Sequence, residues 1–129
     1  MEKNKSIGEL AIIFLNFRDI MKIYHWQTKS YARHKASCSL IEGLDEKTDR
    51  FIEVMSGSRN SRPIIPNEYQ TFTLENQTDD SALKLLYKFK SFLENVLPKY
   101  LSDKDTELLN IRDEILADVN QALYLFTFH

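Results

Sequence analysis

The sequence has little of what interrupts a helix or cross-links a chain. Three glycines and three prolines in 129 residues leave long stretches with nothing to end a helix. The single cysteine, Cys38, has no partner within the chain, so intrachain disulfides are excluded and a reducing compartment is expected. No run of about eighteen apolar residues occurs, which argues against a membrane-spanning helix. Burial of apolar side chains must therefore supply the stability.

The sequence also shows neither a signal peptide nor an excess of positive charge. The opening residues 1–5 are too few and too charged for a signal peptide, so we expect an intracellular protein, in the cytoplasm or in a host cell or virion. The formal net charge of −2 gives no general attraction to phosphate backbones. Nucleic acid is therefore not the favoured partner, and no membrane partner is expected.

What the sequence does have is apolar residues spaced for helices. Apolar side chains make up 43% of the chain, and in four stretches they recur at alternating steps of three and four residues. This spacing places one apolar seam along each helix. It predicts helices over residues 6–28, 33–56, 79–101 and 103–127.

Local signals suggest where the first two helices begin and end. Ser6 followed by Glu9 is typical of a capping box, so the first helix is predicted to start there. A tight turn is expected near residues 29–32. Gly57 is predicted to cap the C-terminus of the second helix.

A long connection should follow the second helix. Residues 57–78 contain Pro63 and Pro66, several polar residues and no helical period. Connections of this length are uncommon in compact domains, which suggests that this one packs on the bundle or contacts a partner. Four of its apolar residues are candidate anchors, namely Ile64, Ile65, Tyr69 and Phe72.

Capping residues and a proline also indicate where the last two helices begin, bend or end. Thr78 precedes two aspartates, which is favourable at a helix N-terminus. Pro98 should either kink the third helix at about Glu94 or fray it before Ser102. Ser102 with Asp105 is predicted to cap the last helix.

Four amphipathic helices, none able to bury its seam alone, most simply close into one bundle. We therefore predict an all-α fold, a single antiparallel four-helix domain spanning residues 1–129.

Potential metal ligands line one side of the second predicted helix. At about 100° per residue they fall within roughly a quarter turn beside the apolar seam. Imidazole and carboxylate groups there could hold a metal where another helix or subunit covers them. The alternative is a solvated acidic face balanced by Lys47 and Arg50. The residues of this strip are His34, Cys38, Glu42, Asp45, Asp49 and Glu53.

The pair His25 and Trp26 lies near the end of the first predicted helix. A single histidine at such a position is most often a structural residue with satisfied hydrogen bonds, and that alternative stays open here. His129 is the last residue and indicates little.

Taken together, these residues resemble the Dps mini-ferritins, a ferritin-like family. That family has a His-Trp near the end of its first helix, then a His on the second helix with an Asp fifteen and a Glu nineteen residues later. His25-Trp26 and the set His34, Asp49 and Glu53 match this pattern. The compact block between the two histidines also resembles uncharacterised ferritin-like proteins of large DNA viruses and phages, which would imply a role in an infected cell.

The chain departs from the family pattern at two points. The two histidines are about three residues closer, and Cys38 stands where the family has an Asp. A small buried residue is the favoured role for Cys38, and a softer metal ligand is the alternative.

The resemblance implies a shared iron site. His25 and His34 of one subunit would face Asp49 and Glu53 of a second, with Cys38, Asp45 and Trp26 as secondary candidates. It implies iron as the metal, a homodimer or larger homo-oligomer, and ferroxidase activity where the site is intact.

Two other functions stay open from the residues themselves. A ferritin-like bundle that has lost its catalytic activity would serve as a structural or interaction protein. A hydrolase would use Cys38 as nucleophile and His34, one helical turn away, as base.

Overall fold

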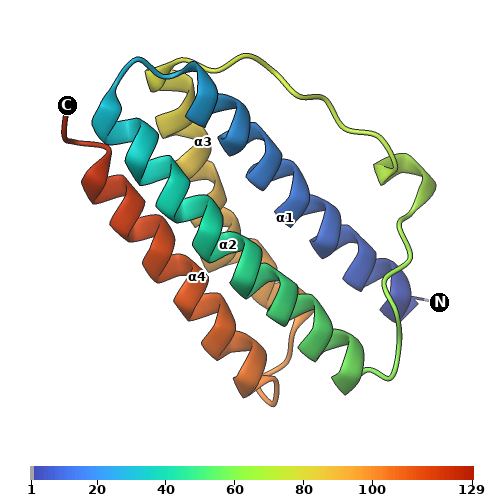
Figure 1. The fold of residues 1–129 in the computed structure, drawn as a ribbon. Coiled ribbons are helices and arrows are strands. Elements are labelled where there is room, and N and C mark those ends of the chain that lie inside the picture. The colour runs from blue at the N-terminus through green and yellow to red at the C-terminus, as the bar shows by residue number, and fades with distance from the viewer. Residues whose placement is uncertain (1) are drawn as a thin grey trace.

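The computed structural model describes residues 2–129 of the chain, and four long helices account for most of them (Figure 1). They are α1 (Glu2–Gln27), α2 (Tyr31–Ser58), α3 (Asp79–Ser91) and α4 (Thr106–Leu125). Residues 2–129 contain no strand. The predicted all-α class and the four helices are confirmed.

The first helix begins earlier than its capping signal suggested. α1 already includes Glu2, so Ser6 lies inside the helix and the predicted capping box is wrong. Residues 2–5 are Glu, Lys, Asn and Lys, and none of them stops a helix. Glu9 instead accepts a hydrogen bond of 2.9 Å from the Tyr100 hydroxyl, which joins α1 to the region after α3.

The second helix also differs at its ends. Its N-cap is Ser30, whose Oγ accepts from the Arg33 amide at 3.2 Å, so the turn occupies residues 28–30. Gly57 lies within α2 and is not the predicted cap. The left-handed conformation after the helix falls on Asn60, with φ 47°, and asparagine tolerates that region better than most residues.

The third helix loses its α-helical geometry where Pro98 was expected to disturb it. Its start is as predicted, because Thr78 and Ser81 form a reciprocal capping box. After Ser91 the chain continues as a π-helical turn, Phe92–Val96, and a 3₁₀ turn, Leu97–Tyr100. Proline has no amide hydrogen to donate to the preceding turn, so the regular ladder cannot continue.

The fourth helix starts later than predicted. Asp105 is its N-cap and its carboxylate accepts from the Ser102 amide at 2.8 Å, which holds residues 102–105 in a turn. The expected start at residue 103 is therefore wrong.

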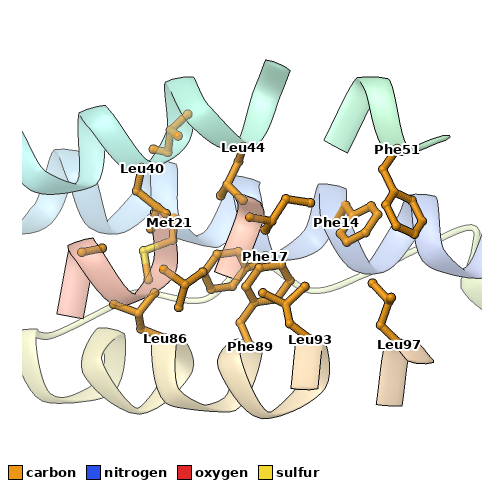
Figure 2. Packing of buried hydrophobic residues seen from close by; sticks show 14 of the residues in the cluster. Phe14, Phe17, Met21, Leu40, Leu44, Phe51, Leu86, Phe89, Leu93 and Leu97 are labelled. Carbon is orange, nitrogen blue, oxygen red and sulfur yellow. The ribbon is translucent and has the colours of Figure 1, made fainter. Parts of the chain in front are cut away.

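Side chains from all four helices fill the core. Phe17 on α1 stacks on Phe89 of α3 with ring centroids 3.8 Å apart, and Phe14 meets Phe51 of α2 edge-on at 5.5 Å (Figure 2). On α4 the buried positions recur at steps of three and four residues, as predicted for one apolar seam: Leu108, Ile111, Ile115, Val119 and Ala122.

Residues 59–78 run along α1 from one end to the other (Figure 1). The Ile64 amide donates to the Asn4 carbonyl at 3.0 Å, and the Gln77 amide donates to Gln27 Oε1 at 2.7 Å. The loop contains one 3₁₀ turn, Asn67–Tyr69. Pro66 is its buried residue, whereas Ile64, a predicted anchor, is half exposed.

Within residues 2–129, no helix has both the length and the apolar content needed to cross a bilayer.

Candidate functional site

Two histidines stack where α1 ends and α2 begins. The rings of His25 and His34 lie 3.9 Å apart between centroids and are inclined by 17°. Their backbone contacts are reciprocal. His25 Nδ1 lies 2.9 Å from the His34 carbonyl oxygen, and His34 Nδ1 lies 2.8 Å from the His25 carbonyl oxygen.

This reciprocity determines the tautomer of both rings. A carbonyl oxygen can only accept, so each Nδ1 carries the hydrogen, and in the neutral ring the lone pair is on Nε2. No hydrogen bond from the described residues reaches either Nε2. Metals bind neutral imidazole, and a backbone carbonyl on the other ring nitrogen is the usual way of orienting a histidine ligand.

The surroundings of His25 favour its neutral form. The side chain is buried, and Ser37, also buried, places its Oγ 3.1 Å from His25 Nδ1 while donating to the His34 carbonyl at 3.0 Å. Burial lowers the pKa of His25 below its ordinary value, the hydrogen bond to the His34 carbonyl opposes this, and the nearby Lys22 charge adds to the lowering. At neutral pH the ring is therefore uncharged.

The predicted carboxylate ligands lie elsewhere in the chain. Asp49 and Glu53 are exposed on α2, and neither forms an ion pair with the described side chains. At about 1.5 Å of rise per residue they are roughly 22 Å and 28 Å along the helix from His34. One chain therefore does not bring the four predicted ligands together, and residues 2–129 contain no group of three or more potential ligands.

The secondary candidates have other contacts. Asp45 accepts two hydrogen bonds from Arg18 of α1, at 3.0 and 3.2 Å. Cys38 is partly exposed and its thiol faces Glu42 at 3.7 Å. Trp26 is 66% exposed, with Lys22 Nζ 5.4 Å from its ring centre.

Lys47 and Arg50, which were expected to balance the acidic strip, instead lie next to acidic residues of α4. Lys47 pairs with Asp118 of α4, and Arg50 approaches Glu114 of α4 at 3.9 Å. Within the described residues, Arg18 from α1 is the cation that neutralises part of the strip. The strip is therefore left with exposed carboxylates toward Glu53.

Sequence reasoning missed the groups that hold the histidine pair in place. Nothing in the residue type singles out Ser37, although its position three residues after His34 allows its hydroxyl to reach that carbonyl. Nearby, the Tyr24 hydroxyl donates to Asp79 at 2.7 Å and accepts from Arg33 at 3.2 Å. These bonds connect α1, α2 and α3 beside the pair.

Fold and site together define a four-helix protein with a fixed pair of imidazoles at one end. The model of the Family of unknown function (DUF5856) matches residues 25–126, so the chain belongs to this family. The matched region includes His25, His34, Asp49 and Glu53. No curated protein and no solved structure matches the chain.

Proposed function

We propose that this protein is a ferritin-like, Dps-like metal-binding protein that takes up iron at a site shared by two copies of the chain. The observation that carries the proposal is the stacked pair His25 and His34, in which both Nδ1 atoms are engaged and neither Nε2 atom is hydrogen-bonded among the described residues. Imidazole nitrogen suits iron and other first-row metals.

The course of the chain supports a ferritin-like topology. Ferritin-like bundles contain one long crossover connection, and residues 59–78 travel the length of α1 before α3 begins (Figure 1). Contacts along neighbouring helices run in opposite order, as in the pairs Arg18–Asp45 and His25–His34 between α1 and α2. This order supports antiparallel neighbours.

The position of the carboxylates supports a shared site. Asp49 and Glu53 are too far from the histidines in one chain, but both are exposed and unpaired among the described residues. If α2 crossed its two-fold copy, His34 of each chain would approach these residues of the other, because a two-fold interface exchanges equivalent contacts. Each dimer would then contain two sites.

At such a site the protein would supply nitrogen and carboxylate donors and limit access of water. Ferrous iron would be the substrate, and its oxidation would require peroxide or oxygen as the electron acceptor. Ferroxidase activity stays a prediction that depends on the complete ligand set.

Anaerobic titration with ferrous iron, followed by light scattering, tests the proposal. We expect saturable binding of one iron per chain by a dimer or larger oligomer, lost in His25→Ala and His34→Ala. His129→Ala is the matched control, because it removes the third histidine from the chain end and should bind normally. Absence of stoichiometric binding by the unaltered protein would refute the proposal.

Mixing two inactive variants tests whether the site is shared. His34→Ala and Glu53→Ala should each fail to bind iron alone. In a mixed dimer one site carries both substitutions and the other carries neither, so binding should return in part. If mixing restores nothing while the unaltered protein binds iron, the ligands do not come from two chains.

A second candidate is a ferritin-like bundle without chemistry that acts as a structural or interaction protein. It is favoured by Cys38, which stands where the family pattern has an Asp and whose thiol faces Glu42. In that case Glu53→Ala would leave every measured property unchanged. The hydrolase hypothesis has no such support, because no hydrogen bond among the described residues joins Cys38 to His34.

A further inference from the structure

A groove on the opposite side of α1 from α2 is unrelated to the histidine pair. It lies between α1 and α3 beneath the loop, and its volume is about 380 Å³. Phe17 and Phe89 line it as buried side chains stacked on each other, and its exposed aromatic surface comes from Tyr69 and Phe72 of the loop. Small-molecule sites usually have volumes of about 300–1,000 Å³ and mainly apolar walls with a few polar groups.

Three polar side chains line the same groove, one from each of its walls. They are Asn16 on α1, Lys88 on α3 and Thr71 on the loop. None of the three forms a hydrogen bond or ion pair with the described side chains or backbone. Lys88 therefore offers an unneutralised ammonium group beside an apolar surface.

The loop covers the groove without being bonded across it. Its hydrogen bonds to α1 lie near its ends, at Arg62, Ile64, Asn76 and Gln77. Among the described residues, those of segment 66–75 bond only within the loop. The segment is therefore held over the groove at both ends.

We propose that this groove binds an aliphatic carboxylate, with the alkyl chain against the aromatic side chains of the groove and the carboxylate on Lys88. Charge complementarity selects the ligand. An anionic group beside Lys88 gains a charge-assisted hydrogen bond, while an alkyl chain removes the exposed surface of Tyr69 and Phe72 from water. Asn16 can donate a second hydrogen bond from the facing wall. The proposal is independent of iron binding.

Isothermal titration calorimetry with decanoate, below its micellar concentration, tests this site. We expect one decanoate per chain and at least tenfold weaker binding of decylamine, which has the same chain and the opposite charge. Lys88→Gln should weaken decanoate about tenfold. Lys84→Gln is the matched control, because Lys84 is exposed one turn earlier on α3 and does not line the groove.

A third variant tests the location. Leu85→Trp places a larger side chain at the groove wall and should abolish decanoate binding, with circular dichroism to confirm that the helices persist. His25→Ala should bind decanoate normally, so failure of the metal proposal and failure of this one are distinguishable.

Several results would overturn the proposal. They are the absence of saturable decanoate binding, equal binding of decylamine, equal effects of the two lysine substitutions, and full binding by a folded Leu85→Trp variant. A dimer that binds no decanoate would indicate that a second copy of the chain covers the groove.

Discussion

Replacing Asp105 with asparagine should weaken the contact between the C-terminus of α2 and the N-terminus of α4. Arg59, the C-cap of α2, donates to both carboxylate oxygens of Asp105, the N-cap of α4, at 2.8 and 3.0 Å. Both side chains are largely buried, with 19% and 13% exposed. The pair therefore fastens two helix ends at one end of the bundle, where solvent screening is limited.

The pKa of Asp105 provides the magnitude. The hydrogen bonds from Arg59, the largest cause, lower this pKa from 3.8 to about 2; burial opposes them and Ser102 assists. At about 1.4 kcal/mol per pKa unit, the charged form contributes about 2 kcal/mol to the free energy of unfolding at pH 7. Since the folded pKa is depressed, this contribution is complete above pH 3.8 and is lost as the pH falls toward 2.

Urea unfolding followed by circular dichroism measures the effect. Asp105→Asn should lose about 2 kcal/mol at pH 7, and the difference from the unaltered protein should fall below about 1 kcal/mol by pH 2.5. Asp103→Asn is the control, because Asp103 is exposed in the same turn and should change stability by less than about 0.5 kcal/mol. Equal effects of the two substitutions, or a pH-independent loss in Asp105→Asn, would refute the reasoning.

Two further predictions concern the loop and the 3₁₀ turn Leu97–Tyr100. Gly8→Ala would place a Cβ against the Ile64 carbonyl, so it should destabilise the protein by about 1–3 kcal/mol and increase proteolysis of residues 59–78; unchanged cleavage would contradict this. Burial, with the hydrogen bond to Glu9 second, raises the pKa of Tyr100 from 10.0 to about 12. Stability should therefore decline from pH 10 to about 12, and less so in Tyr100→Phe, as measured by urea unfolding.

Much of the fold could be predicted because it depends on neighbours in the sequence. Helical spacing of apolar residues determined the four helices and the seam of α4, and the capping box at Thr78 needs only residues 78–81. Pro98 likewise acts on its own turn, where the α-helix gives way to other geometry. Such signals are local, since each depends on a few consecutive backbone groups.

Two of the predicted helix ends are wrong at places where residues distant in the sequence meet. Helix α2 continues past Gly57 to Ser58, and Arg59 then binds Asp105, 46 residues away. The same contact helps to hold residues 102–105 in a turn, so α4 starts at Thr106. Residue spacing alone contains no information about which helix ends meet.

The candidate site likewise has features that the sequence predicts and features that only the tertiary structure decides. Residue type and helical period placed His34, Asp49 and Glu53 on one strip of a predicted helix, and the resemblance to the Dps mini-ferritins added His25 as a ligand. Only the tertiary structure, through a three-residue turn between α1 and α2, brought the two imidazoles into a stack and directed each Nδ1 to the other's carbonyl.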